Sequence, residues 1–385
     1  MLRVYCDANA TTPLLPEVIE AMRPFWTEQF GNASSIHQEG QKARKAIEAA
    51  REVLARFFHC HEAEVVFNSG GTEGDNTAIA GLVRRGDHMI TTSIEHSAVL
   101  RAAERAADRG ALVTFVSPRA NGIIDPGDIR SALRPETRLI SIMLANNETG
   151  VLQPVEEIGN IAENAGAFFH IDAVQGAGKV PFDVRRFGCH LCSISAHKVH
   201  GPKGIGAMYV RRGTPIEPLI VGGSHERRQR AGTENVAGIA GLGKAAELAM
   251  KTLEDGAIQR LAALRDRLEA GVLRISGTRV NGSGAPRVAN TTNIRFEQVE
   301  GEALVIALDL KGVAVSGGSA CHSGSTEPSH VLMAMGLDRH AALASLRFSL
   351  LKTATDADVD HVLRVVPQAV GHLRALSPEG VGTLG

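Results

Sequence analysis

A lysine stands just beyond a short β-rich run in the segment SISAHKVHGPKGIGAMYV (193–210), inside a turn rich in serine, histidine and glycine. A lysine amine in this position can form a Schiff base with an aldehyde cofactor. Ser195 and His197 are polar donors that can hold a phosphate, and the glycines after Lys198 leave room for a bulky ligand. Lys198 alone would more often be a solvated surface lysine, so its surroundings decide the interpretation. GPKGIG lacks the GK[ST] ending of a Walker A loop.

A second segment, FNSGGTEGDNTAIAGLV (67–83), has the pattern of an anion site. A strand-like run ends there, Gly70 and Gly71 turn the chain, and Thr72 opens a helix. The free N–H groups and the positive end of such a helix suit a phosphate monoester. A glycine turn capped by Thr72 explains the same residues equally well.

A carboxylate and an amide follow another strand-like run, in HIDAVQGAGKVP (170–181). Asp172 ends the run and can pair with a protonated pyridine nitrogen, which keeps the ring electron-poor. Gln175 follows three residues later as a further polar group. The structural alternative is that Asp172 is the N-cap of a helix over 173–178.

Two more polar residues stand after strand-like runs, His96 in TTSIEHSAVL and Asn147 in LANNETGV. His96 can stack on an aromatic ring, and Asn147 can donate a hydrogen bond to a phenolic oxygen. A lone histidine there would more often be structural, and the residues after Asn147 also make a plain turn. Each signal is weak, but five ligand-type features at successive strand ends are difficult to attribute to chance.

The elements that carry these residues alternate between short apolar runs and helical stretches. Predicted strands cover 64–68, 88–92, 111–116, 139–145, 167–172, 191–195 and 205–210, and predicted helices cover 37–57, 73–85, 95–109 and 155–165. Strands that are apolar throughout, with helices between them, predict an α/β fold whose mostly parallel, seven-stranded sheet is covered on both faces. In such sheets ligands gather beyond the carboxyl ends of the strands, where the residues above are expected.

The C-terminal part has a different pattern, which predicts a smaller α+β unit. A long helical stretch over 234–275 leads into it; strands are predicted at 290–296, 312–316 and 347–350, and helices at 300–310, 328–336 and 356–374. We therefore expect a large domain over 14–256. Residues 1–13 and 257–385 are expected to form a small domain that carries Cys321.

Composition limits the class of protein. With 385 residues, 44% of them apolar, and a net charge of −1, the chain can fill two globular cores and lacks the charge of a nucleic-acid or membrane-surface binder. Neither a secretory signal nor a membrane-spanning run is apparent, so we expect a cytoplasmic protein. Cys189 and Cys192 have the spacing of a zinc or redox pair, but their run is typical of a buried strand and no metal is expected.

The sequence resembles the cysteine desulfurases, and within them the nitrogenase-associated (NifS) and housekeeping (IscS) branch. These belong to the class V aminotransferase group of fold-type I pyridoxal-phosphate enzymes. The similarity runs in order through nearly the whole chain. The segments that carry it are YCDANATTP, SGGTEGDNTAI, IEHSAVL, ANNETGV, HIDAVQGAGKVP, SAHKVHGPKGIGAMYVRRG, HERRQRAGTEN, SGGSACHSGSTEPSHVL and RFSL.

The resemblance implies pyridoxal 5'-phosphate as the cofactor, L-cysteine as the substrate and a homodimer as the assembly. Its motifs assign Lys198 to the Schiff base, Asp172 to the pyridine nitrogen, Gln175 and Asn147 to the phenolic oxygen, His96 to stacking on the ring, and Gly71, Thr72, Ser195 and His197 to the phosphate. Thr233 is expected to reach the phosphate of the neighbouring subunit. Arg347 is expected to hold the substrate carboxylate, with Asn9 and Asn147 near the substrate end.

The resemblance also makes Cys321 the nucleophile. Its thiolate would take the sulfur of L-cysteine as a persulfide, release alanine, and deliver the sulfur to an acceptor such as an iron–sulfur cluster scaffold protein. The loop SGGSACHSGS is small and polar enough to serve as the delivering arm. Four positions depart from the usual family pattern: His322 stands where threonine is commoner, Gly317 where serine is usual, Gly71 where alanine or cysteine is frequent, and Ala8 where a larger residue is typical.

Three alternatives remain open at this stage. A selenocysteine lyase would use the same cofactor on a related substrate. An aminotransferase for small amino acids would need no cysteine in the loop and would release a keto acid. A scaffold without activity would not need Lys198, Asp172 and Cys321 together.

Overall fold

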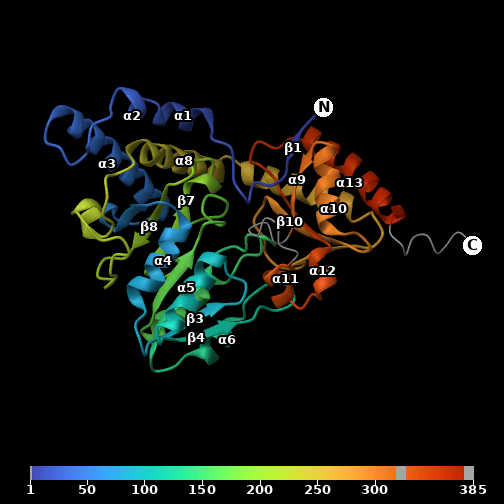
Figure 1. The fold of residues 1–385 in the computed structure, drawn as a ribbon, viewed down its shortest axis with the longest axis horizontal. Coiled ribbons are helices and arrows are strands. Elements are labelled where there is room, and N and C mark those ends of the chain that lie inside the picture. Colours follow the sequence, from blue (N-terminus) through green and yellow to red (C-terminus); the bar gives the residue numbers. More distant parts are fainter. Residues whose placement is uncertain (1, 318–326, 377–385) are drawn as a thin grey trace, which may run out of the picture.

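The computed structural model describes residues 2–317 and 327–376 (Figure 1). Within these residues seven strands form the larger sheet, in the spatial order β2 (Val65–Asn68), β8 (Gly206–Val210), β7 (Leu191–Ser195), β6 (Phe168–Asp172), β5 (Thr137–Met143), β3 (His88–Thr92) and β4 (Leu112–Val116). Strand β8 runs antiparallel to both its neighbours, and the other pairs are parallel. The predicted mostly parallel sheet is thus confirmed.

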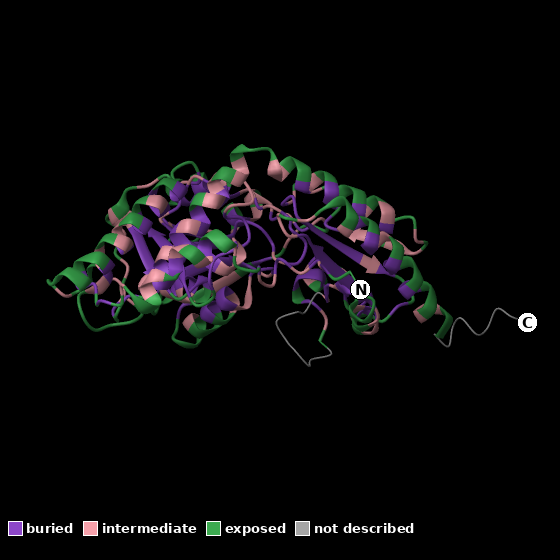
Figure 2. Ribbon diagram, turned by 90° about the horizontal axis from the view of Figure 1, so that it is seen from above, coloured by how far each residue is buried: buried purple, intermediate pink, exposed green. Residues whose placement is uncertain are grey.

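Both faces of this sheet are buried under helices, because successive side chains of a strand point to opposite faces. Met89 packs on the face covered by α4 (Gly71–Leu82) and α5 (Ser97–Asp108). Its neighbour Ile90 packs on the other face. That face is covered by α3 (Gln38–Phe58), α6 (Pro126–Ala132), α7 (Val155–Ala165) and α8 (Val236–Glu254). The strands consequently lie in the buried interior (Figure 2).

The C-terminal half has its own sheet and its own core. The sheet has the order β12 (Ser316–Gly317), β13 (Ser345–Ser349), β10 (Thr291–Phe296) and β9 (Thr278–Asn281), and its pairs are antiparallel. Strand β1 (Val4–Tyr5) pairs in parallel with β11 (Val313–Ala314), which brings the N-terminus into this half. The helices here are α9 (Ala257–Val272), α10 (Gly301–Leu310), α11 (His330–Ala334), α12 (Arg339–Leu343) and α13 (Asp356–Leu376).

Most predicted elements are present, with ends that differ by no more than two residues for the strands of the large sheet. The helical stretch predicted over 234–275 is present. It is two helices, α8 and α9, because Gly256 has a left-handed backbone (φ 76°) that a continuing helix does not allow. The strand predicted over 312–316 was wrong, since its two ends belong to different sheets. Helices α1 (Pro16–Met22) and α2 (Pro24–Thr27) were not predicted.

No helix in the described part of the chain is long and apolar enough to span a membrane.

A buried ion pair holds the loop that contains the basic run HERRQR (225–230). Arg51 on α3 donates to both carboxylate oxygens of Glu226, at 2.7 and 2.8 Å, and both side chains are 2% exposed. Glu226 also accepts the N–H of Phe67 on β2 at 2.9 Å. Residues Glu226, Arg227 and Arg228 all have positive φ, which non-glycine residues rarely adopt. The ion pair therefore stabilises a strained turn.

We predict that Arg51→Met destabilises the protein by about 3–5 kcal/mol, because it leaves Glu226 buried without its countercharge. Denaturant unfolding of the two proteins measures this difference. Arg101→Met is the control, since Arg101 pairs with Glu104 on the surface and a surface pair contributes about 1 kcal/mol or less. Equal effects of the two substitutions would contradict the prediction.

Candidate active site

A cavity of about 510 Å³ lies at the carboxyl ends of β5, β6 and β7. It collects residues from distant parts of the chain, including most of those singled out in the sequence. The predicted site residues that line it are Asn9, Gly71, Thr72, His96, Asn147, Asp172, Gln175, Ser195, His197, Lys198 and Arg347. Thr233 is exposed and is not among the lining residues. Cys321 lies outside the described residues.

One end of the cavity is formed by the N-terminus of α4. Gly70, with φ 142°, precedes the helix and has no side chain to cap it. The first N–H groups, which lack an intrahelical partner at the start of any helix, therefore receive no side-chain cap. A Cβ atom on Gly71 would lie 2.5 Å from Cγ2 of Val174, and this close approach explains the glycine. Ser195, at the end of β7, and His197 line the same cavity. Together these groups make a cradle for an anion.

Asp172 ends β6 and is buried at the cavity wall. Its Oδ1 accepts the N–H of Val174 at 2.9 Å, in a turn and not at the start of the helix considered above. Burial raises the pKa of Asp172, while His96 and Lys198 act in the opposite direction. A cation brought into the cavity beside this carboxyl would therefore be stabilised by it.

His96 has the structural role considered for it, and its ring also lines the cavity. Its Nδ1 accepts the N–H of Ala98 at 3.1 Å, which caps α5. Nδ1 is therefore unprotonated, and the ring proton of the neutral form is on Nε2. Burial lowers the pKa of His96, so the neutral form is favoured.

Lys198 follows β7 in a 3₁₀ turn and reaches the N-terminal segment. Its Nζ donates to the backbone carbonyls of Asn9 at 2.6 Å and Ala10 at 2.8 Å. The Asn9 carbonyl also accepts Nε2 of Gln175 at 2.8 Å. The lysine amine and the amide are thus held side by side at the cavity wall.

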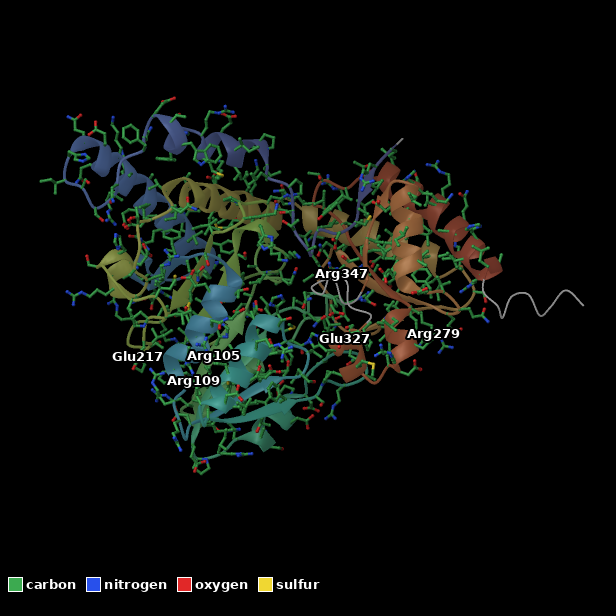
Figure 3. The ribbon with its side chains drawn as sticks, in the orientation of Figure 1. Arg105, Arg109, Glu217, Arg279, Glu327 and Arg347 are labelled. Atoms are coloured by element: carbon green, nitrogen blue, oxygen red, sulfur yellow. The ribbon has the colours of Figure 1, made fainter. Side chains whose placement is uncertain are left out.

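Arg347 on β13 is buried where the two halves of the chain meet (Figure 3). Its Nη2 donates to Asp7 at 2.6 Å, and its Nη1 donates to the carbonyl of Asn147 at 3.0 Å. Nε is buried and has no hydrogen-bond partner in the described structure. The sequence did not single out Asp7, although it lies in the segment YCDANATTP that carries part of the resemblance.

These residues fit pyridoxal 5'-phosphate. The anion cradle, the buried carboxyl of Asp172 and the amine of Lys198 provide the three kinds of group that its phosphate, ring nitrogen and aldehyde require. The cavity also has the size range of small-molecule and cofactor sites.

Comparison with known proteins gives the family. The aminotransferase class-V family profile matches residues 4–362. A cysteine desulfurase IscS of Methanosarcina thermophila is 49% identical over 379 residues, which cover 97% of this chain and 94% of the relative. The chain belongs to the class-V aminotransferase family, among the cysteine desulfurases. A cysteine desulfurase IscS of Dictyoglomus turgidum is 48% identical and is covered to 96%.

Solved structures of the family have the same fold. A NifS-like protein superposes with a TM-score of 0.90 at 36% identity, over 97% of this chain and all of that one. A structure described as SspA in complex with cysteine has a TM-score of 0.81 at 36% identity, over 90% of this chain and 98% of that one. These matches confirm the predicted fold and family.

In this desulfurase Ser329 and His330 form hydrogen bonds with the loops that follow β5 and β3. Ser329 donates its hydroxyl to the buried carboxylate of Glu148, whose pKa burial raises to about 7. His330, at the start of α11, forms a hydrogen bond through Nε2 with the carbonyl of Glu95 at 2.9 Å. The sequence showed Glu148 only as part of a possible turn, and its contact with Ser329 needs the folded chain.

Further carboxyl groups lie buried around the Asp172 site of the desulfurase, and the sequence reasoning missed them. Oε1 of Glu95 accepts from Thr92 Oγ1 at 2.6 Å and from the N–H of Met143 at 3.1 Å. Burial raises the pKa of Glu95 to about 8, and the charge of Asp172 adds to the shift. Glu95 is therefore mostly protonated at neutral pH, which limits the negative charge near Asp172.

The raised pKa of Glu95 predicts a pH-dependent stability. A carboxyl that binds its proton more tightly in the folded state stabilises that state below its unfolded pKa, and the contribution is lost as pH rises through about 8. We expect Glu95→Gln, which cannot ionise, to gain about 4 kcal/mol relative to the natural protein between pH ~5 and ~8. Urea unfolding at several pH values measures this gain.

The surface exchange Glu104→Gln is the control for this series, because the Glu104 side chain is 51% exposed. A difference between Glu95→Gln and the natural protein that stays constant with pH would contradict the prediction.

Proposed function

We propose that this chain is a pyridoxal-phosphate enzyme that converts L-cysteine to L-alanine and retains the sulfur on Cys321 as a persulfide. The observation that carries the proposal is the cavity, in which the anion cradle, Asp172, Lys198 and Arg347 converge. One similar solved structure is described as SspA in complex with cysteine, and this supports L-cysteine as the substrate of the present chain.

The cofactor would be held by three sets of groups. The N-terminus of α4, with Gly71 and Thr72, would bind the phosphate together with Ser195 and His197. Asp172 would pair with the ring nitrogen, Gln175 and Asn147 would donate to the phenolic oxygen, and His96 would lie on the ring. Lys198 would bind the aldehyde. When bound, the cofactor stores the electron pair left on the substrate carbon as a proton or the sulfur departs.

The guanidinium of Arg347 would bind the substrate carboxylate. Its two NH₂ groups already donate to Asp7 and to the carbonyl of Asn147, so its plane is fixed before substrate binds. A guanidinium held in this way loses little freedom when it forms a bidentate pair. Asn9 and Asn147 would line the substrate end.

The amine of Lys198, once released, would move the α-proton of the substrate, and the neutral imidazole of His96 would exchange a proton at Nε2. The thiolate of Cys321 would attack the substrate sulfur and form an S–S bond. The C–S bond breaks, and its electron pair remains on the substrate carbon. That carbon is then protonated, and the product released is alanine. Cys321 keeps the sulfur as a persulfide.

The wider assignments follow from the family. We propose a homodimer, in which Thr233 reaches the phosphate of the neighbouring subunit, and a sulfur-acceptor protein such as an iron–sulfur cluster scaffold as the recipient. We also propose the division into a large domain over 14–256 and a small domain formed by 1–13 and 257–385. The cytoplasmic location stays a prediction from the sequence.

We predict that the purified protein, supplied with pyridoxal 5'-phosphate, L-cysteine and a reductant, releases equal amounts of sulfide and alanine. Cys321→Ala should lose sulfide release and keep the visible band of the cofactor. A band without sulfide would redirect the assignment to a selenocysteine lyase or an aminotransferase, and assays with selenocysteine and for keto acids separate these two. The absence of any band would contradict the role of Lys198.

We predict that Arg347→Lys raises KM for L-cysteine by about tenfold or more, because a lysine cannot form the bidentate pair with the carboxylate. The absorbance of the bound cofactor should not change. Steady-state kinetics and a visible spectrum of the same preparation measure both quantities. An unchanged KM would exclude Arg347 as the carboxylate-binding residue.

A further inference from the structure

A second lysine, Lys179, lies beside Lys198 and has no role in the function proposed above. It is partly buried and follows Gln175 by one helical turn of sequence, in the turn after β6. Its Nζ donates to Oε1 of Gln175 at 2.8 Å and to Oδ1 of Asn9 at 2.9 Å. Both acceptors are neutral amide oxygens, and both residues line the cofactor cavity.

No carboxylate of the described residues forms an ion pair with Lys179, so ion pairing does not explain its position. Burial lowers the pKa of Lys179 to about 7, and the charges of Lys198 and Arg347 act in the same direction. Burial and neighbouring positive charges disfavour the charged form of a lysine, so this position does not favour the stability of the fold. Groups perturbed in this way are concentrated at functional sites.

Two contacts hold the amide of Gln175 in one orientation, one from Lys179 and one to the carbonyl of Asn9. A lysine amine held against an amide contacts its oxygen when charged, because an ammonium can donate and cannot accept. Oε1 of Gln175 therefore faces Lys179, and Nε2 is the atom left to donate. In the structure Nε2 donates to the carbonyl of Asn9 at 2.8 Å, the same carbonyl that accepts Nζ of Lys198 at 2.6 Å.

The same logic applies to the side chain of Asn9. Its Oδ1 accepts from Lys179 and from Nδ2 of Asn290 at 3.2 Å. Its Nδ2 consequently faces the carbonyl of Asn147, at 3.1 Å, and the hydroxyl of Thr291, at 2.9 Å. Lys179 thus helps to set the donor directions of two amides at the cofactor cavity, together with the carbonyls of Asn9 and Asn147.

We propose that Lys179 is a positioning residue for the desulfurase reaction. It orients Gln175 so that Nε2 points toward the phenolic oxygen of the cofactor, and it holds Asn9 so that its carbonyl receives the amine of Lys198. The proposal rests on the proposed function, since it needs pyridoxal 5'-phosphate in the cavity. Lys179 acts through Gln175 and Asn9 and does not itself contact the reacting atoms.

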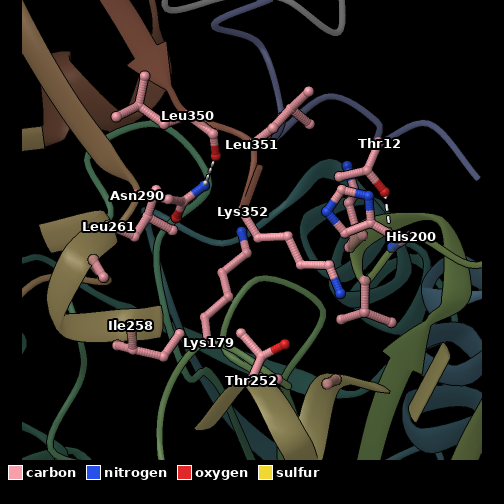
Figure 4. A pocket seen from close by; sticks show the side chains of 16 residues that line it. Thr12, Lys179, His200, Thr252, Ile258, Leu261, Asn290, Leu350, Leu351 and Lys352 are labelled. Atoms are coloured by element: carbon pink, nitrogen blue, oxygen red, sulfur yellow. Dashed lines mark hydrogen bonds between the residues drawn. The ribbon is translucent and has the colours of Figure 1, made fainter. Parts of the chain in front are cut away.

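The chain contains a matched control. Lys352 and Lys179 reach into the same small cavity, of about 50 Å³ (Figure 4), and Lys198 lines both this cavity and the cofactor cavity. Burial lowers the pKa of Lys352 as well. Lys352 forms neither of the hydrogen bonds to Gln175 and Asn9 that Lys179 forms. Removing its amine therefore changes the charge near the site without changing the amide directions.

The experiment compares Lys179→Met with Lys352→Met in the full-length enzyme reconstituted with pyridoxal 5'-phosphate. For Lys179→Met we expect an altered visible spectrum of the bound cofactor at one fixed pH, because its phenolic oxygen loses an oriented donor. We expect kcat to fall about tenfold or more and KM for L-cysteine to change little, since Arg347 is untouched. Lys352→Met should match the natural enzyme in all three quantities.

Two further variants make the result specific. Lys179→Arg keeps N–H donors, and the adjoining cavity has room for its larger head, so it should move the spectrum back toward that of the natural enzyme. In a Gln175→Ala background Lys179→Met should alter the spectrum much less, because its target is gone. Lys179→Ala, which likewise has no hydrogen-bond donor, replaces Lys179→Met in every comparison if that variant does not fold.

Two results would overturn the proposal: a spectrum and kcat of Lys179→Met that equal those of Lys352→Met, or an effect of Lys179→Met that is undiminished in the Gln175→Ala background. Failure of the proposed function is recognised separately. In that case the natural enzyme itself binds no pyridoxal 5'-phosphate or releases no sulfide from L-cysteine.

Discussion

The hydrogen bonds of Asn9 join the parts of the chain from which the cavity is built. Its backbone carbonyl accepts from Lys198 and Gln175, which follow strands of the large sheet. Its backbone N–H donates to Ser349 of the C-terminal sheet at 3.0 Å, and its side chain reaches the carbonyl of Asn147. A buried residue with every polar group satisfied in this way has one favourable position, so the two halves meet in a defined arrangement.

Burial sets the electrostatics around this junction. Carboxyl groups are enclosed near the cavity, and burial raises the pKa values of Asp172, Glu95 and Glu148. The same burial lowers the pKa of Lys179 and favours the neutral form of His96. Burial thus disfavours the charged forms of these groups. A ligand with an anionic phosphate and a cationic ring nitrogen supplies charges that complement the site.

The large sheet was predictable because its signal is local. Met89 and Ile90 are adjacent apolar residues that face opposite helical layers, and a strand apolar throughout records this in the sequence alone. The break at Gly256 was not predicted, because a glycine within a helical pattern is compatible with a continuous helix until its φ is known. Nor was the buried role of Glu226, whose partner Arg51 is 175 residues away.

By itself the sequence determined the family, the order of strands and helices, and the polar residues that stand at strand ends. These are properties of short segments, and a motif such as SAHKVHGPKG carries them without the rest of the fold. The tertiary structure decided which distant groups meet. Arg347 and Asp7 are 340 residues apart, and Lys179 and Asn9 are 170 apart. Hydrogen bonds between such residues leave no periodic pattern in the chain, so they appear only when it is folded.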